Sequence, residues 1–238
     1  MPDAVPAFLR PLVDGAADTP LHHYSRLAPP RDGSGRASAV LVAFAERVPD
    51  ADGPGVLLIQ RAATLRRHPG QVAFPGGAVD PEDADIVAAA LREAREEVGL
   101  DPASVTPVLS LPALYIARSG FVVSPVVAWW HHPHPVSPVD PAEVAGAALA
   151  PVAELTDPAH RFTVAHPSGL LGPGFAVRGL FVWGFTAILL DQLLTLAGWN
   201  RPWDHRVHRE IPADVASAVL GDDHRVRPRT EPPLSDER

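Results

Sequence analysis

Residues 76–100 read GGAVDPEDADIVAAALREAREEVGL, and this stretch decides how we interpret the whole chain. Apolar side chains recur at helical spacing from Ile86 to Val98, which predicts a helix that stops at Gly99. Asp83 stands before this run, and we expect its side chain to cap the helix. Since residues three or four apart share one face of a helix, the three glutamates of this helix lie within one turn of each other: Glu93, Glu96 and Glu97.

The three glutamates suggest a site that holds divalent metal against phosphate. Like charges so close repel each other and destabilise the helix, and a cation offsets that repulsion. Hard divalent ions such as Mg²⁺ take oxygen ligands and commonly bind through a few carboxylates together with a substrate phosphate. The glycine pair Gly76 and Gly77 allows the backbone to approach a ligand closely. The alternative is a solvated charged face on which Arg92 pairs with Glu96, worth about a few tenths of a kcal/mol.

Basic side chains precede the glycine pair within residues 60–77, a segment with Pro and Gly that we expect to be a structured loop. Arginine binds phosphate through paired hydrogen bonds, so this segment suits a phosphate-rich ligand. Arg92, inside the helix, is expected to orient a glutamate rather than to contact the substrate. The basic residues of the segment are Arg61, Arg66, Arg67 and His68.

Apolar runs elsewhere predict an α+β fold, an α/β sandwich built on a mixed sheet. Further helices are expected just after Pro6, from about residue 181, and at residues 211–220. We divide the chain into an N-terminal extension that docks on the rest (1–35), a main domain (36–200), and a C-terminal helix with a disordered tail (201–238). The expected strands are residues 37–45, 56–59, 105–111, 121–129, 146–152, 161–165 and 175–178.

Two segments allow a second interpretation. Residues 179–199 are long and apolar enough for a membrane span, but Asp191 and Gln192 interrupt the run, and we interpret it as a buried core helix. The clustered histidines after residue 130 resemble a metal site, yet the prolines between them predict exposed side chains, and we assign no metal there. They are His131, His132 and His134.

Composition restricts the function further. The 238-residue chain has a formal charge of −8, which disfavours nucleic acid as a partner. It contains no cysteine, which excludes disulfides, thiolate metal sites and thiol catalysis. All 20 of its lysine or arginine positions are arginine, so lysine chemistry is excluded too. The start of the sequence has no basic segment followed by an apolar run, and we expect a cytoplasmic protein without membrane attachment.

Residues 76–100 resemble the signature of the Nudix hydrolase family, in which a glycine and a spaced acid precede Arg-Glu-apolar-x-Glu-Glu-x-Gly-apolar. Two departures occur in the first half. The acid is Asp83 rather than glutamate, and eight residues instead of the usual seven separate it from Arg92. The second half matches throughout, with Arg92, Glu93, Ala94, Glu96, Glu97, Gly99 and Leu100.

Residues 57–77, LLIQRAATLRRHPGQVAFPGG, resemble the additional motif of the coenzyme A pyrophosphatase branch of that family. That motif reads Leu-Leu-Thr-x-Arg-Ser/Ala, then spaced Arg, Gly and Phe-Pro-Gly-Gly, and Ile59 stands where threonine is usual. The branch is also similar in the spacing of its acid, and the later stretches SGFVVSPVVA and FVWGFTA look like it. The resemblance covers roughly residues 37–194, and the matching motif residues are Arg61, Ala62, Arg66, Gly70, Phe74, Pro75, Gly76 and Gly77.

This resemblance implies a Nudix fold, a mixed sheet between helices, that hydrolyses a nucleoside diphosphate linked to another moiety. For this branch the expected substrate is coenzyme A or acyl-CoA, cut to 3',5'-ADP and (acyl-)4'-phosphopantetheine with Mg²⁺ or Mn²⁺. Glu93, Glu96 and Glu97 are then the metal ligands. The general base is one of these glutamates or Glu143, which matches an acidic position in related sequences and is equally open to being a surface glutamate. The implied substrate contacts are Arg61, Arg66, Arg67, His68, Gly76 and Gly77.

Two other functions stay open at this point. One is a Nudix pyrophosphatase for ADP-ribose or dinucleotides, which a comparison of substrates would separate from the first. The other is a non-catalytic Nudix module that binds nucleotide as a sensor, although the complete set of acids disfavours it. A homodimer is also left open.

Overall fold

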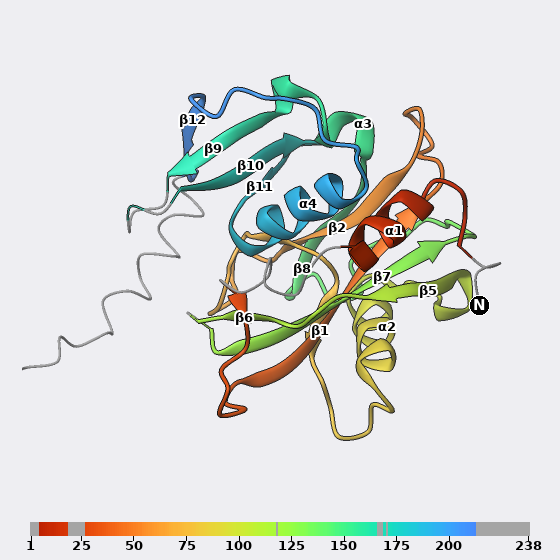
Figure 1. Ribbon diagram of the computed structural model, residues 1–238. Coiled ribbons are helices and arrows are strands. Elements are labelled where there is room, and N and C mark those ends of the chain that lie inside the picture. Colours follow the sequence, from red (N-terminus) through yellow and green to blue (C-terminus); the bar gives the residue numbers. More distant parts are fainter. Residues whose placement is uncertain (1–4, 19–26, 118, 166–168, 170, 213–238) are drawn as a thin grey trace, which may run out of the picture.

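The computed structural model describes residues 5–18, 27–117, 119–165, 169 and 171–212, and its elements form alternating layers of helix and sheet (Figure 1). Helix α2 (Ile86–Val98) covers one face of a large mixed sheet, while α1 (Arg10–Asp18) and α4 (Gly184–Leu196) cover the other. A second, smaller sheet packs on the far side of α4. The α+β class and the mixed sheet between helices are confirmed.

The large sheet has eight strands and is mixed because β1 (Arg36–Ala45) runs parallel to β7 (Phe121–Trp130) but antiparallel to its other neighbours. The strand order is β3-β2-β1-β7-β5, with β8 paired to β2, β4 to β1 and β6 to β7. The five strands expected here are confirmed to within a few residues. The other bounds are β2 Gly55–Arg61, β3 Val72–Ala73, β4 Gly76–Ala78, β5 Val105–Ser110, β6 Leu114–Ile116 and β8 Val144–Pro151.

Strand β1 is buried on both faces, which explains its almost continuous apolar run. Its side chains alternate, because successive residues of a strand point to opposite faces of a sheet. Leu41 and Ala43 pack with the residues of α2, whereas Val42 and Phe44 pack with those of α1 and α4. Full burial of a side chain the size of Leu41 or Phe44 contributes roughly 1.5–3 kcal/mol. Strand β1 therefore anchors both helical layers.

Helix α2 begins and ends at capping residues. The Asp85 carboxylate accepts a hydrogen bond of 2.8 Å from the N–H of Ala88, and Gly99 closes the helix in the left-handed conformation with a φ of 69°. The expected cap at Asp83 was wrong. Its carboxylate binds the Arg92 guanidinium instead, which leaves the cap to the aspartate two residues later.

Residues 60–77 are not a single loop. Two very short strands, β3 and β4, interrupt the segment and pair with β2 and β1 respectively. Elements of two and three residues are too short to produce a readable alternation in the sequence. Their pairing nevertheless places the segment along the large sheet, where its glycine pair meets the second half of α2.

The second sheet has four strands in the order β11-β10-β9-β12. The strand expected at residues 161–165 is confirmed, and the one at 175–178 is longer than expected. The helix expected from residue 181 starts only at Gly184, because residues 180–182 form a hairpin strand with β10. The bounds are β9 Arg161–Ala165, β10 Leu171–Val177, β11 Leu180–Val182 and β12 His208–Glu210, with short helices α3 (Val152–Leu155), η3 (Pro102–Ser104) and η4 (Pro158–His160).

Helix α4 is the apolar core helix that the sequence favoured. Its Leu190 and Leu193 are buried against the large sheet and β10. Asp191, which interrupts the apolar run, pairs with the buried guanidinium of Arg161 on β9. Among the described residues, none of the helices combines the length and the apolar character needed to cross a bilayer.

Helix α1 confirms the helix expected after Pro6. Leu12 of α1 and Leu9 just before it are fully buried in the core that contains α4, and a side chain at Gly15 would come within 2.1 Å of the carbonyl oxygen of Leu196. Of the helix expected at residues 211–220, Ile211 and Pro212 are not helical, and the remainder lies outside the described residues together with the C-terminal tail.

Candidate functional site

Glu97 is the most enclosed of the three glutamates on α2, with 7% of its side chain exposed. Its Oε2 accepts a hydrogen bond of 2.9 Å from the backbone N–H of Gly76, and its Oε1 lies 3.8 Å from Nη1 of Arg61. Burial raises the pKa of Glu97 to about 7; the charges of Glu93 and Glu143 also raise it, while the Gly76 hydrogen bond and Arg61 lower it. This carboxylate therefore changes its charge near neutral pH.

Glu93 lies one turn earlier and faces the second glycine of the pair. A β-carbon at Gly77 would lie 2.4 Å from the Oε1 atom of Glu93, and one at Gly76 would lie 2.3 Å from the carbonyl oxygen of Ala39 on β1. The lack of a side chain is thus needed at both positions, at Gly76 because the backbone of β1 is close and at Gly77 because the Glu93 carboxylate is close. Burial raises the pKa of Glu93, although the neighbouring Arg92 guanidinium opposes the rise.

Arg92 binds most of the acidic side chains at this end of the site. Its Nε and Nη2 atoms donate to the two carboxylate oxygens of Asp83, each at 2.9 Å, in the paired geometry typical of arginine and carboxylate. Its Nη1 atom donates to Glu93 at 3.2 Å and to Glu96 at 3.1 Å. The Asp83 hydrogen bonds to this guanidinium lower the pKa of that aspartate. Arg92 thus contacts two of the three glutamates, and its role in orienting a glutamate stays a prediction.

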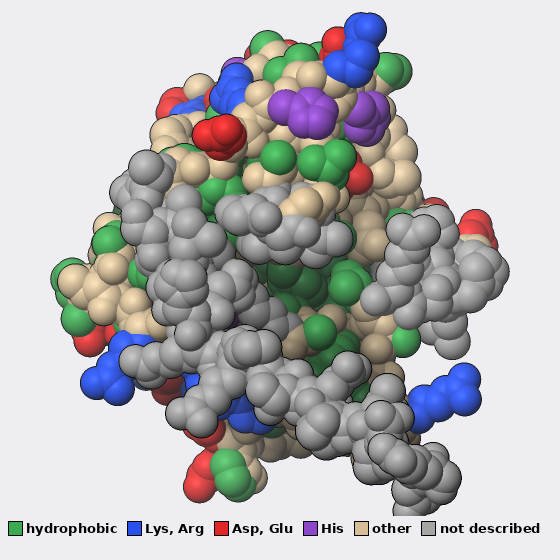
Figure 2. Space-filling model, turned by 90° about the vertical axis from the view of Figure 1, so that its left-hand side faces the viewer, with side chains coloured by type: hydrophobic (Ala, Val, Ile, Leu, Met, Phe, Trp, Pro, Cys, Tyr) green, Lys and Arg blue, Asp and Glu red, His purple; other side chains and the backbone are tan. Residues whose placement is uncertain are grey.

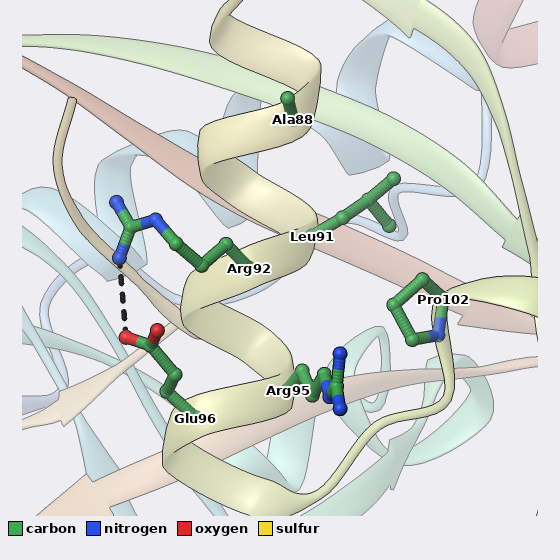
Figure 3. A pocket seen from close by; sticks show the side chains of 6 residues that line it. All are labelled: Ala88, Leu91, Arg92, Arg95, Glu96 and Pro102. Atoms are coloured by element: carbon green, nitrogen blue, oxygen red, sulfur yellow. Dashed lines mark hydrogen bonds and ion pairs between the residues drawn. The ribbon is translucent and has the colours of Figure 1, made fainter. Parts of the chain in front are cut away.

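Glu96 is the exposed member of the three, with 60% of its side chain accessible. Figure 3 shows its carboxylate turned toward Arg92, beside a depression of about 550 Å³ on the outer side of α2 that Arg95 and Pro102 also line. In the part of the chain that the structure describes, no three acidic, histidine or cysteine side chains converge as metal ligands. Glu93 and Glu97 face the glycine pair, whereas Glu96 faces Arg92.

Arg61 lies between Glu97 of α2 and the segment that contains Glu143. It ends β2, and the next residue, Ala62, donates a backbone hydrogen bond of 2.9 Å to the carbonyl oxygen of Glu143. The Glu143 side chain is exposed, and its charge contributes to the raised pKa of Glu97. The Nε atom of Arg61 is buried without a hydrogen-bond partner. A buried donor of this kind favours an anionic ligand beside it.

A cavity of about 600 Å³ opens beside the glycine pair and is lined by both glycines and by Arg61, Arg67 and His68. The backbone of His68 adopts a φ of 52°, which turns the chain there, and its Nδ1 atom lies 3.1 Å from Oε1 of Gln71. Of the four basic residues predicted as substrate contacts, Arg66 is exposed and does not line this cavity.

Three aromatic residues that also line the cavity were missed by the sequence reasoning. Phe121, Trp183 and Phe185 line it, together with Gly184 and Thr186 at the start of α4. Figure 2 shows hydrophobic side chains deep in a hollow on this side of the molecule. The aromatic cluster FVWGF was the available signal, but only the tertiary packing of α4 shows which way it faces.

The three clustered histidines lie elsewhere, at the end of β7. His132 is exposed as expected, but His131 and His134 are half-buried, and their rings pack edge-on against Trp129 and Trp130 at centroid distances of 5.4 Å. The expectation that all three are exposed was therefore wrong, because the two tryptophans cover two of the rings.

Comparison with known proteins gives a consistent result. The NUDIX domain family model matches residues 36–168 of the chain. A protein of Cronobacter sakazakii called "Uncharacterized Nudix hydrolase NudL" is 42% identical over 170 residues, which cover 68% of this chain and 83% of that protein. The protein of the same name from Citrobacter koseri is 40% identical over 173 residues, with the same coverage.

Among solved structures, the Nudix hydrolase RenU of M. smegmatis aligns with a TM-score of 0.50 and 19% sequence identity. The alignment covers 75% of this chain and 98% of RenU. At this identity the likeness concerns the fold alone.

Proposed function

The chain belongs to the Nudix family of hydrolases, and from this premise we propose that it is a coenzyme A diphosphatase. The proposed reaction is hydrolysis of the pyrophosphate of coenzyme A or acyl-CoA to 3',5'-ADP and (acyl-)4'-phosphopantetheine, with Mg²⁺ or Mn²⁺ as cofactor. One observation carries the proposal: the buried Glu97 and the half-buried Glu93 contact the glycine pair, and this pair lines a cavity together with Arg61, Arg67 and His68. This arrangement suits a substrate with a pyrophosphate and a further phosphate.

Mg²⁺ or Mn²⁺ fits the oxygen donors that α2 offers. Burial is the main cause that raises the pKa of both Glu93 and Glu97, and the charge of Glu93 adds to the rise at Glu97. A divalent cation offsets both the burial of these charges and their repulsion. We assign Glu93 and Glu97 as ligands, joined by Glu96 when its side chain leaves Arg92. When bound, the metal supplies charge neutralisation at the phosphoryl oxygens and makes water more acidic.

Protein groups then have to hold the pyrophosphate and accept one proton. Water oxygen bonds to one phosphorus, the bridging P–O bond breaks, the second phosphate leaves with the bridging oxygen, and the proton of water goes to a base. We propose Glu143 as this base for two reasons. Its backbone carbonyl accepts a hydrogen bond from Ala62, the residue after Arg61, and its charge contributes to the raised pKa of Glu97. Glu93 and Glu96 are the alternatives. The glycine pair and Arg61 limit the motion of the pyrophosphate during the attack.

The arginines support a substrate with more than one phosphate group. The buried Nε of Arg61 has no hydrogen-bond partner, and a phosphate oxygen of the pyrophosphate would provide one. Arg67 and His68 line the same cavity farther along the loop, and we assign them to the 3'-phosphate of coenzyme A. Arg66 lies outside the cavity and takes no part in this assignment.

A comparison of substrates tests the proposal. The kcat/KM values are measured with Mg²⁺ and with Mn²⁺ on coenzyme A, an acyl-CoA, ADP-ribose and dinucleotides. We expect coenzyme A or acyl-CoA to be preferred by about tenfold or more, which is about 1.4 kcal/mol of transition-state stabilisation. A preference for ADP-ribose or a dinucleotide would assign the alternative Nudix activity. Nucleotide binding without turnover of any of them would indicate a sensor module.

We also propose that the protein acts on small molecules in the cytoplasm, without a nucleic-acid or membrane partner. The net charge of −8 supports this proposal, because it repels the phosphate backbone of nucleic acids and anionic lipid surfaces. The oligomeric state stays a prediction, with a homodimer left open.

A further inference from the structure

One wall of the substrate cavity is aromatic and comes largely from the start of α4. Trp183 precedes the helix and Phe185 lies in its first turn, and Phe121, the first residue of β7, lines the same cavity. The match to the NUDIX domain model ends at residue 168. Trp183 and Phe185 therefore lie beyond that match, in the stretch FVWGFTA that resembles the coenzyme A pyrophosphatase branch.

The start of α4 is held in place over the cavity by neighbouring strands. The hydroxyl of Thr186 donates a hydrogen bond of 2.9 Å to the carbonyl oxygen of Val72 on β3, and it is buried. Just before the helix, Val182 pairs with Phe175 in the second sheet. The aromatic side chains on either side of Gly184 are thus positioned before any ligand arrives, which reduces the entropy lost on binding.

The ring of Phe121 packs against the side chain of the exposed Arg36. The Arg36 guanidinium lies over the Phe121 ring at 4.2 Å from its centroid, and Phe121 lines the cavity whereas Arg36 does not. A cation over an aromatic ring holds that ring in place. The cavity is therefore lined by aromatic groups from two elements and by the loop that carries Arg67 and His68.

We propose that this aromatic wall, formed by Phe121, Trp183 and Phe185, is the subsite for the adenine ring of the substrate. The inference rests on the proposed function for the identity of the substrate and goes beyond it by assigning the adenine ring to the three aromatic side chains of this cavity. Aromatic side chains stack on nucleobases, and the same cavity carries cationic groups for phosphate. The 3',5'-ADP half combines a flat base with two phosphate positions, whereas the phosphopantetheine half has one phosphate and a flexible amide chain.

Binding of the two reaction products tests this assignment, because it separates the two halves of the substrate. Isothermal titration calorimetry measures the affinities of 3',5'-ADP and of 4'-phosphopantetheine for the parent, Phe185→Leu and Trp183→Leu. Each variant keeps an apolar side chain but loses the flat ring, so we expect about fivefold to tenfold weaker binding of 3',5'-ADP. The affinity for 4'-phosphopantetheine should stay within about twofold in the same variants.

Phe181→Leu is the matched control. Phe181 lies in the same hairpin, but its ring packs on Phe162 of the second sheet at a centroid distance of 5.1 Å and does not line the cavity. This variant should bind both products like the parent. Thermal unfolding identifies variants that fail to fold, and Phe121→Leu on β7 replaces Trp183→Leu in the comparison if α4 does not tolerate the change.

Unchanged binding of 3',5'-ADP in the folded variants would overturn the inference. So would a selective loss of 4'-phosphopantetheine binding, or a loss confined to long acyl-CoA substrates, since either would assign the wall to the other half. Failure of the proposed function is distinguishable. If coenzyme A is not hydrolysed but 3',5'-ADP binding still depends on Phe185, only the function is wrong; if coenzyme A is hydrolysed without that dependence, only the inference is wrong.

Discussion

The carboxylate of Glu97 accepts a hydrogen bond of 2.9 Å from the backbone N–H of Gly76, 21 positions earlier in the chain. This bond joins the last turn of α2 to strand β4 and closes the loop and helix between them into one unit. It also holds a carboxylate whose pKa burial raises to about 7. The ionised form of Glu97 is therefore unfavourable at this buried position unless a cation lies beside it.

The stability of the metal-free protein should fall as the pH rises from about 4.5 to about 7. Between the usual pKa of 4.5 and the folded-state pKa of about 7, the unfolded chain releases the Glu97 proton while the folded chain keeps it. The free energy of unfolding therefore decreases over this range, by up to about 3 kcal/mol from this group. Glu97→Gln removes this contribution, so at pH 8 in chelator the variant should be more stable than the parent in urea unfolding.

Near pH 4.5 the two proteins should be similar in stability, because Glu97 is then protonated in the folded parent. Curves that stay parallel from pH 4.5 to 8 would show that Glu97 titrates like an ordinary glutamate. In assays with Mg²⁺ the same substitution should abolish most activity, and turnover within a few-fold of the parent would contradict the assignment of Glu97 as a ligand.

The two glycines should respond differently to alanine. At Gly77 the new β-carbon meets the end of the flexible Glu93 side chain, at 2.4 Å from Oε1, so Gly77→Ala displaces the carboxylate with little loss of stability. At Gly76 it meets the carbonyl oxygen of Ala39 at 2.3 Å, and backbone cannot move aside so easily. We expect Gly77→Ala to lower kcat by about 100-fold and Gly76→Ala mainly to lower the melting temperature.

Gly146→Ala on β8 is the control for both, because no heavy atom lies within 4 Å of its added β-carbon. It should change neither kcat nor the melting temperature appreciably. Full activity in Gly77→Ala would mean that the position of Glu93 does not matter for the reaction.

Glu143 should be needed for turnover but not for binding. If its carboxylate takes the proton from water, Glu143→Gln lowers kcat by about 10²–10⁴-fold and leaves KM within a few-fold. Glu46→Gln, at an exposed glutamate next to the end of β1, is the control and should leave kcat unchanged. Unaltered turnover in Glu143→Gln would return the role of base to Glu93 or Glu96.

Arg161 should matter for stability because it is a buried cation with several partners. Its guanidinium donates to Asp191 and, at 2.5 Å, to Asn200, and it lies 4.7 Å from the ring centroids of both Phe175 and Trp203. Arg161→Met leaves Asp191 without its cation and should lower the free energy of unfolding by roughly 2–4 kcal/mol. Arg206→Met, at an exposed pair with Asp204, should have no measurable effect in the same urea titration, and equal losses would contradict the account.

Elements with long, regular apolar patterns could be predicted from the sequence. The continuous apolar run of β1 indicates a strand buried on both faces, and the helical spacing of apolar residues in α2 indicates a helix buried on one face. The exact cap of α2 could not be predicted, because Asp83 and Asp85 are chemically equivalent in the sequence. Only the position of Arg92 in space decides which of them is free to cap.

Some residues of the candidate site could likewise be predicted from the sequence, and others could not. The acids of α2 and the basic residues before the glycine pair are neighbours in sequence, so their motif predicted that they lie near one cavity. Phe121, Trp183 and Phe185 reach that cavity through the pairing of β7 and the docking of α4, and such contacts between distant segments leave no local periodicity. Strand β11 was hidden for the same reason, because its pairing with β10 overrides the helical pattern.

Analysis of the products formed from coenzyme A is the decisive test of the proposed activity. The pure protein is incubated with coenzyme A and Mg²⁺ or Mn²⁺ at neutral or mildly alkaline pH, with chelator and Glu97→Gln as controls, and the products are separated by chromatography. We expect equal amounts of 3',5'-ADP and 4'-phosphopantetheine, formed only by the parent protein in the presence of metal. Absence of 3',5'-ADP, or its formation to the same extent in chelator, would show that the protein is not a metal-dependent coenzyme A diphosphatase.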